Sequence, residues 1–374
     1  MEKRIEIIDE VTVRFAGDSG DGMQLTGTLF AKNCGAVGDD VNTFPDYPSE
    51  IRPPADTLYG VSAYQVHFGS KKMNTMGDKI DILFAMNAAS LKVNLPYLKK
   101  GAIIIANTAG FGPNNLKLAK YTSNPLEDGS LADYKVIGVN IQSIMKEELK
   151  DLSLQVKQVD RTKNFFALGI AYWMFSEPLD ITIQWLKSKF GKKIEIFESN
   201  VRALKAGFKY AEESPEFEVR YQVPRAQMKP GYYRNITGNE AVALALVAAS
   251  EKTGLPLYLG SYPITPATEI LHHLSGYKQY GVKILQAEDE IAGIASAIGA
   301  AFAGNLAATT TSGPGLSLKV ESLGLAVIME LPLVVVDVQR AGPSTGMPTK
   351  PEQSDLFLAM FGRHGEAPIP IIAA

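Results

Sequence analysis

The first part of the chain, from about residue 9 to residue 200, alternates short apolar runs with segments of helical periodicity. Strand-type runs lie at 11–16, 61–69, 81–86, 101–107 and 134–140. Helical patterns lie at 22–35, 89–100, 161–175, 181–190 and 194–213. Strands that alternate with helices indicate an α/β protein built around a layered sheet. We therefore predict an α/β domain over residues 1–212.

A second alternation follows residues 213–238, where prolines and charged residues replace the periodic pattern and predict a linker. Helices are predicted at 240–254, 265–274, 290–304 and 315–330, and strands at 256–260, 282–288, 306–313 and 331–339. Thr265 should cap its helix, with Pro266 at the first helical position. The closing run 368–374 resembles another buried strand, so the sheet of this 239–374 domain looks incomplete. We expect a fragment, or a subunit that lacks its last domain.

Composition narrows the class of protein only slightly. Of 374 residues, 46% are hydrophobic and 21% charged, and the formal net charge is −3. That balance is ordinary for a globular protein and gives no electrostatic case for nucleic acid or a membrane surface. The N-terminal MEKRIEIIDE is charged and has no apolar signal core. A cytoplasmic location is the expectation.

Cysteine and histidine are scarce. Cys34 is the single cysteine, and His272 and His273 are the only adjacent pair among four histidines. One cysteine can form no intrachain disulfide and hold no iron–sulfur cluster by itself. We expect no metal ligands in this chain.

The loop GDSGDG at 17–22 joins the first predicted strand to a helix. Its glycines do not follow the G-x-G-x-x-G order of dinucleotide sites. Gly20-Asp21-Gly22 matches the start of a magnesium–diphosphate loop, but no asparagine follows in the window 46–52. Two interpretations remain: a loop that binds an anion through backbone N–H groups, or a plain turn that needs a positive φ.

Residues 288–340 carry a more specific pattern, in which an acid opens a helix of small residues and a threonine-rich strand ends in TSGPG. This resembles the pyrimidine-binding domain of thiamine diphosphate enzymes. The resemblance implies that Glu290 assists proton transfer at the pyrimidine ring, with Ser312 and Gly313 also at the cofactor. Glu288 and Asp289 compete for that role, and an acid that complements the helix dipole is the alternative.

Two further motifs resemble the alpha subunit of 2-oxoacid:ferredoxin oxidoreductases. The first is Tyr262-Pro263-Ile264-Thr265-Pro266, and the second is VQRAGPSTGMPTK at 338–350. The family implies that Thr265, Arg340 and Thr349 bind the substrate carboxylate, with Lys350 as a further candidate charge. A guanidinium fork suits a carboxylate. The alternatives are a helix cap for Thr265 and a surface ion pair for Arg340.

The front of the chain extends this resemblance, since PSEIRPPADTLYGVSAYQVHFGS resembles the Rossmann-like gamma domain that such enzymes carry. Pro53 stands there where the family usually has glycine. The family also makes coenzyme A a candidate ligand of the loop at Gly20, Asp21 and Gly22. The resemblance thus implies a fused gamma–alpha subunit.

The implied reaction is oxidative decarboxylation of a 2-oxoacid with coenzyme A, giving acyl-CoA and CO2 and passing electrons to ferredoxin. The fused layout and Arg340 favour 2-oxoglutarate, with pyruvate and branched acids left open. The diphosphate site, Mg2+ and iron–sulfur clusters are expected on partner chains, in particular a beta subunit, which makes a hetero-oligomer. The alternatives are a non-oxidative enzyme of acetolactate synthase type and a non-catalytic scaffold subunit.

Overall fold

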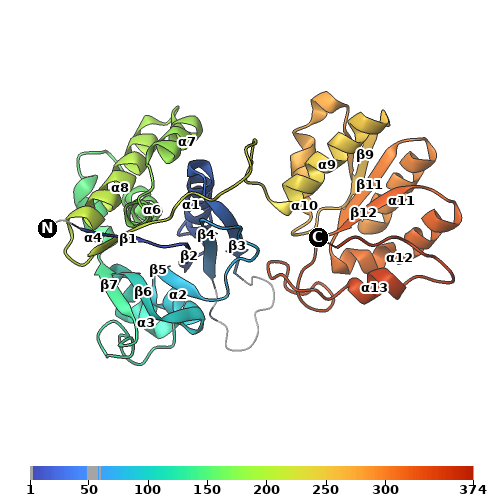
Figure 1. The fold of residues 1–374 in the computed structure, drawn as a ribbon. Helices are drawn as coiled ribbons and strands as arrows, with labels where there is room; N and C mark the ends of the chain where they lie inside the picture. Colours follow the sequence, from blue (N-terminus) through green and yellow to red (C-terminus); the bar gives the residue numbers. More distant parts are fainter. Residues whose placement is uncertain (1–2, 49–57, 59, 374) are drawn as a thin grey trace. The chain divides into compact units, whose positions relative to one another are not determined.

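The computed structural model describes residues 3–48, 58 and 60–373 (Figure 1). Within these ranges the chain divides into two compact units, with the division between Asn235 and Ile236. Each unit is described by itself below. Pro53 lies outside the described residues, as do the other residues of 49–57 and residue 59 in its motif.

The first unit is organised around a 6-stranded mixed sheet. The strand order is β3 (Asp40–Asp46), β4 (Val61–Gly69), β2 (Glu10–Asp18), β5 (Ile80–Ala85), β6 (Leu98–Asn107) and β7 (Lys135–Val139). The pairs β3–β4 and β4–β2 are antiparallel, and the remaining pairs are parallel. Strand β3 was not predicted, because DVNTFPD lacks alternation and all its residues are half-buried. Its Pro45 is tolerated because β3 is an edge strand.

Helices cover both faces of this sheet, as Figure 1 shows. In β5, Ile82 and Phe84 face one core while Leu83 and Ala85 face the other, as the alternation of strand side chains requires. The larger core is closed by α1 (Met23–Val37), α4 (Ile141–Glu148), α6 (Lys163–Met174), α7 (Asp180–Phe190) and α8 (Ile194–Glu213). The smaller core is closed by α2 (Ala88–Asn94), η2 (Thr108–Phe111) and the segment around α3 (Pro113–Leu118). The short elements η1 (Leu95–Tyr97) and α5 (Val156–Asp160) complete this part.

Helix α6 is the buried centre of the larger core, and glycines let α8 approach it closely. A Cβ at Gly169 would lie 2.1 Å from the backbone oxygen of Leu204, and one at Gly207 would lie 2.0 Å from that of Phe166. No larger residue fits at either position without moving a backbone. The two glycines therefore allow α6 and α8 to pack in close backbone contact.

A short parallel pair, β1 (Arg4–Ile7) with β8 (Val219–Gln222), also belongs to the first unit. Strand β8 lies inside the stretch 213–238 that the sequence predicts as a linker. The predicted domain limits remain predictions.

The second unit contains a 4-stranded sheet in which every strand is parallel to its neighbours. Its order is β10 (Lys283–Gln286), β9 (Leu257–Ser261), β11 (Leu306–Thr311) and β12 (Leu333–Asp337). Helices α9 (Gly238–Thr253) and α10 (Thr268–Ser275) pack on one face. The other face is covered by α11 (Glu290–Phe302), α12 (Gly313–Ile328) and α13 (Leu356–Phe361), and η3 (Lys278–Tyr280) precedes β10. Together the two units confirm the predicted α/β class.

Two local predictions in this unit are wrong. Helix α10 begins at Thr268 with Ala267 as its N-cap, because the segment before it forms a turn in which the Thr268 N–H donates to Ile264 O at 2.9 Å. Thr265 is therefore not a helix cap, and the peptide bond from Thr265 to Pro266 is cis. The other error concerns 368–373, which forms no strand and leaves Ile372 92% exposed. Pro368 and Pro370 have no N–H to donate to a ladder.

No helix in the described ranges is both long and apolar enough to cross a membrane.

Candidate functional site

The candidate site lies at the carboxyl edge of the parallel sheet in the second unit. Every strand there runs in the same direction, so the segments that follow β9, β10, β11 and β12 emerge at one edge. The predicted residues occupy those segments: Thr265 follows β9, Glu290 follows β10, Ser312 follows β11 and Arg340 follows β12. Ligands of open α/β sheets bind at this position.

Glu290 is the first helical residue of α11. Asp289 is the N-cap, and its Oδ1 accepts the Ala292 N–H at 2.7 Å. The capping role therefore belongs to Asp289, and the side chain of Glu290 is not needed for it. Glu290 is half-buried, and its carboxyl group makes no hydrogen bond or ion pair to the described residues. It is thus available to an external group.

The first turn of α12 closes against Glu290. A Cβ at Gly315 would lie 2.8 Å from Glu290 Cγ and 2.1 Å from Thr311 Oγ1, so only glycine fits there. Ser312 is the N-cap residue of α12, yet its Oγ is buried and has no hydrogen-bond partner among the described residues. Its backbone oxygen accepts from Gly315 N at 2.8 Å. This edge therefore offers a carboxyl group, a hydroxyl group and closely approaching backbone.

Lys319 is a residue that the sequence reasoning missed. Its side chain is 0% exposed, and Nζ donates to Glu290 O at 2.8 Å and to Thr309 Oγ1 at 3.1 Å. Burial lowers its pKa to about 8, against the opposing effect of the Glu290 and Asp289 charges. Lys319 thus fixes the backbone of Glu290 relative to α12. The sequence did contain a signal for this burial: Lys319 falls on the same face of α12 as the buried Leu316 and Leu323.

Arg340 connects the motif after β9 with the loop after β12. Nη1 donates to Thr265 O at 2.9 Å, and Nη2 donates to Thr345 O at 2.8 Å. The residue is 6% exposed, and its Nε has no hydrogen-bond partner in the described chain. Arg340 is therefore not part of a surface ion pair, which was its alternative role. Burial lowers its pKa, while the charge of Glu290 opposes that change. Thr265, Glu290 and Arg340 are therefore neighbours.

The other motif residues surround this group. Thr265 is exposed, and its hydroxyl makes no hydrogen bond to the described residues. In the motif, Pro263 and Ile264 are half-buried and Tyr262 is 36% exposed. Thr349 is half-buried in a loop that the Ala341 N–H closes by donating to Lys350 O at 2.6 Å.

A pair of acids, which the sequence did not indicate, lies at the end of β12. Asp355 is 5% exposed, and its Oδ2 would lie 2.9 Å from a Cβ at Gly313. Gln339 Nε2 donates to the other oxygen, Oδ1, at 3.3 Å. Burial and the adjacent Asp355 raise the pKa of Asp337 to about 7. The pair therefore retains a proton under mildly acidic conditions.

This pair predicts a specific pH dependence. Between the ordinary aspartate pKa of 3.8 and the folded value of about 7, the folded chain holds a proton that the unfolded chain has lost. The free energy of unfolding should therefore fall as pH rises through that window. The slope is at most about 1.4 kcal/mol per pH unit, which is reached where the two states differ by one full proton.

Asp337→Asn should remove this fall and stabilise the second unit at pH 8 but not at pH 4.5. Both tryptophans, Trp173 and Trp185, belong to the first unit, so hydrogen exchange of peptides from β12 and α12 is the appropriate measurement. The exposed Glu321→Gln on α12 is the control. The prediction would be contradicted if the peptides from β12 and α12 were equally protected from hydrogen exchange in wild type and in Asp337→Asn at pH 8.

The glycine loop of the first unit is a turn with its own carboxylate inside it. Gly22 has φ +76° and precedes α1, as a plain turn requires. Asp21 Oδ2 accepts the Asp18 N–H at 2.9 Å, and its Oδ1 pairs with Lys163 Nζ at 2.9 Å. The role of Gly20, Asp21 and Gly22 in anion binding stays a prediction, which the negative charges of Asp18 and Asp21 do not favour.

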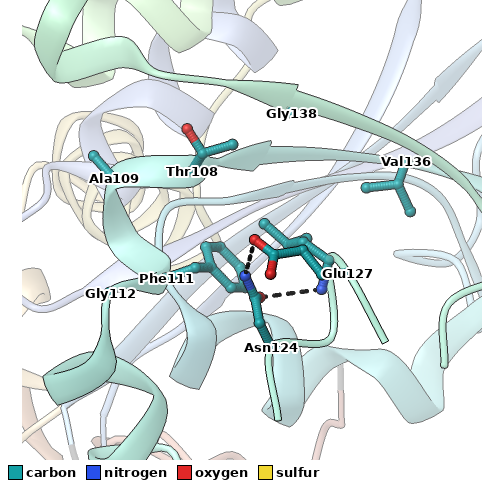
Figure 2. A pocket seen from close by; sticks show the side chains of 9 residues that line it. Thr108, Ala109, Phe111, Gly112, Asn124, Glu127, Val136 and Gly138 are labelled. Carbon is teal, nitrogen blue, oxygen red and sulfur yellow. Dashed lines mark hydrogen bonds between the residues drawn. The ribbon is translucent and has the colours of Figure 1, made fainter. Parts of the chain in front are cut away.

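The first unit also contains a pocket of about 510 Å³, where β6 ends and η2 begins (Figure 2). Thr108, Phe111 and Val136 line it, together with Asn124, whose Nδ2 donates to Glu127 Oε1 at 2.8 Å. None of the described lining residues is basic, and none is a predicted site residue. The pocket therefore gives no support to a phosphate-bearing ligand.

Comparison with protein families gives two matches. Residues 12–210 match the family described as pyruvate ferredoxin/flavodoxin oxidoreductase. Residues 253–374 match the thiamine diphosphate-binding family of pyruvate flavodoxin/ferredoxin oxidoreductase. The first match lies in the first unit and the second match lies in the second unit.

Individual proteins resemble the chain over nearly its whole length. The 2-oxoglutarate oxidoreductase subunit KorA of Mycobacterium tuberculosis is 49% identical over 366 residues, 98% of this chain and 56% of that protein. The 2-oxoacid:ferredoxin oxidoreductase 2 subunit alpha of Aeropyrum pernix is 26% identical, over 98% of this chain and 60% of that protein. The chain thus spans little more than half the length of these curated relatives.

A solved structure is also similar, with a TM-score of 0.77 and 34% identity over 96% of this chain and 57% of that one. It is the 2-oxoglutarate:ferredoxin oxidoreductase of Magnetococcus marinus with 2-oxoglutarate, coenzyme A and succinyl-CoA bound.

Proposed function

Because the chain belongs to the pyruvate ferredoxin/flavodoxin oxidoreductase family, we propose that it is the gamma–alpha part of a 2-oxoglutarate:ferredoxin oxidoreductase. The enzyme would decarboxylate 2-oxoglutarate oxidatively, form succinyl-CoA with coenzyme A, and pass the electrons to ferredoxin. The likeness to a 2-oxoglutarate oxidoreductase subunit supports this substrate over pyruvate and branched acids. Partner chains would complete the enzyme.

One observation carries the proposal: the guanidinium of Arg340 joins the YPITP segment to the loop after β12, and the charge of Glu290 acts on it. Its bond to Thr265 O leaves the Thr265 hydroxyl unused, and its own Nε is unpartnered in the described structure. A guanidinium and a hydroxyl at one edge form a suitable site for a carboxylate. We assign substrate binding to Thr265, Arg340 and Thr349, with Glu290 beside them.

The residues present fit the pyrimidine half of thiamine diphosphate. Gly315 allows backbone to approach a flat ring, and the buried hydroxyl of Ser312 has no hydrogen-bond partner among the described residues. Glu290 would hold a proton at a pyrimidine ring nitrogen, and Ser312 and Gly313 would border the ring. When bound, thiamine diphosphate supplies the electron sink for loss of CO2.

The remaining groups would come from other chains. We assign the diphosphate site with its Mg2+ to a beta subunit, and the iron–sulfur clusters to the beta subunit or to ferredoxin. Cys34 is the single cysteine of this chain and is buried, so it cannot hold a cluster alone. The active form would therefore be a hetero-oligomer.

The test is to assemble the chain with its partner subunit and supply 2-oxoglutarate, coenzyme A and ferredoxin. Stoichiometric succinyl-CoA, CO2 and reduced ferredoxin are expected, with pyruvate and 2-oxoisovalerate much poorer substrates. Acetolactate formed from pyruvate without electron transfer would instead establish the synthase alternative. An assembled complex that neither binds thiamine diphosphate nor turns over would establish the scaffold alternative.

A further inference from the structure

Three potential metal ligands meet in the interior of the first unit, far in the sequence from Thr265, Glu290 and Arg340. They are the thiol of Cys34 and the carboxyl groups of Asp39 and Glu177, whose ligand atoms all lie within 4.8 Å of one another. All three residues are buried, with 0%, 5% and 6% exposed surface. Neither the proposed reaction nor the core packing accounts for two acids and a thiol at this place.

The end of helix α1 places the first two ligands. Cys34 lies in the last turn, and its backbone oxygen accepts from Gly38 N at 3.2 Å and from Asp39 N at 3.0 Å. Gly38 can close this turn because it adopts φ +108°. The chain therefore turns back sharply, and Asp39 is brought to the same place as Cys34.

The end of helix α6 places the third ligand. Ser176 has the unusual φ of +59°, and the Glu177 N–H donates to Tyr172 O at 2.8 Å. Glu177 thereby sits just beyond the carboxyl end of α6, while Cys34 and Asp39 sit at that of α1. A helix carries partial negative charge at its carboxyl end. Both helices therefore add to the negative potential around the acids.

Among the described residues, no buried cation faces these acids. Asp39 Oδ2 and Glu177 Oε2 are both buried and make no hydrogen bond to the described residues. The charge of Arg225, an exposed residue that donates no hydrogen bond to Asp39, opposes the effect of burial on the pKa of Asp39. Burial raises the pKa of Asp39 to about 7 and that of Glu177 to about 8. Unpaired buried acids of this kind are costly unless protons or a cation neutralise them.

We propose that Cys34, Asp39 and Glu177 bind one divalent cation of the zinc class, which ties the end of α1 to the end of α6. A thiolate with carboxylate oxygens suits Zn2+, with bonds of about 2.3 Å to sulfur and about 2.1 Å to oxygen. Tetrahedral ligands at these bond lengths stand about 3.4 to 3.6 Å apart, and the three ligand atoms here lie within 4.8 Å of one another. The site is structural and is independent of the proposed function.

Asn33, which precedes Cys34 in the sequence, is a candidate for the fourth ligand. Asn33 is 0% exposed, and its Nδ2 donates at 2.9 Å to the backbone oxygen of Pro178, the neighbour of Glu177. Its Oδ1 remains unpartnered within the described structure. Either this amide oxygen or a water completes four-coordination. Binding displaces the thiol proton of Cys34 and any proton on the acids.

The test uses the full chain, stripped of metal with a chelator and titrated with Zn2+ or Cd2+ at pH 7.5. We expect one equivalent to bind, with a thiolate-to-metal charge-transfer band for Cd2+ and an unfolding temperature that rises with zinc concentration. Fluorescence reports that transition, because Trp173 lies on α6. Asp39→Asn and Cys34→Ser should each weaken binding by more than about a hundredfold, since even changes outside the ligand set cost 10–100-fold.

Glu212→Gln on the exposed face of α8 is the control and should bind zinc like the wild type. The titration of the wild-type chain decides the matter even if a ligand variant fails to fold. Absence of stoichiometric binding in that titration would overturn the proposal. A Glu177→Gln chain that is more stable than wild type at pH 8 would then mean that the two acids simply share a proton. Tight binding without a thiolate band would also overturn the proposal.

Discussion

Glu290→Gln is expected to lower turnover of the assembled enzyme by about a hundred- to ten-thousandfold while the chain stays folded. The side chain makes no hydrogen bond or ion pair to the described residues, and Asp289, not Glu290, caps α11. An amide of the same size therefore disturbs little of the fold. It cannot exchange a proton with a pyrimidine nitrogen, so the loss should fall on chemistry and not on cofactor affinity.

Two measurements separate this prediction from a structural effect. Exchange of the thiazolium proton should slow in Glu290→Gln, while thiamine diphosphate affinity stays close to that of the wild type. Glu288→Gln is the matched control, because Glu288 is exposed and precedes the capping residue. Loss of exchange in Glu288→Gln alone would shift the assignment by two residues. Normal exchange in both variants would leave the acids with a helix-dipole role only.

Arg340→Met is expected to raise the Michaelis constant for 2-oxoglutarate by roughly ten- to a hundredfold, the effect of losing a charged hydrogen bond of about 1.5 to 3 kcal/mol. Thiamine diphosphate should still bind. The substitution also removes the bonds from Arg340 to Thr265 O and Thr345 O. Part of the effect could therefore arise from a loosened loop.

Thr265→Val separates the two causes. It removes the Thr265 hydroxyl, which makes no hydrogen bond to the described residues, and it leaves the backbone oxygen that Arg340 binds. A higher Michaelis constant in both variants, measured by steady-state kinetics over a range of 2-oxoglutarate concentrations, supports a carboxylate site. If Arg340→Met raises the Michaelis constant and Thr265→Val does not, Arg340 anchors the loop and does not bind the substrate carboxylate.

Much of the predicted site could be located from sequence because its residues follow strands. Thr265, Glu290 and Arg340 each come just after a strand that the apolar pattern marks, and Ser312 lies at the end of another. In a parallel sheet such segments must share an edge. The exact start of α10 could not be predicted, because Thr265-Pro266 looks like a helix cap, whereas the structure places a turn there and begins the helix at Thr268.

Residues whose role depends on burial escaped the sequence analysis. In the sequence Lys319 resembles an ordinary helix lysine. The structure shows that it is 0% exposed and that its amine donates a hydrogen bond to Glu290 O. Asp337 and Asp355 are eighteen positions apart by number and become a pair only where a loop returns to the end of β12. Strand β3 lacks alternation and owes its place to pairing with β4.

The sequence by itself determined the α/β class, the order of most strands and helices, and the motif residues at the edge of the second sheet. Local periodicity and strand direction suffice for these, since they need only neighbouring residues and the geometry of parallel strands. Only the tertiary structure brought Cys34 and Asp39 to Glu177. That meeting depends on how the ends of α1 and α6 pack, and a separation of more than a hundred residues leaves no local signal of it.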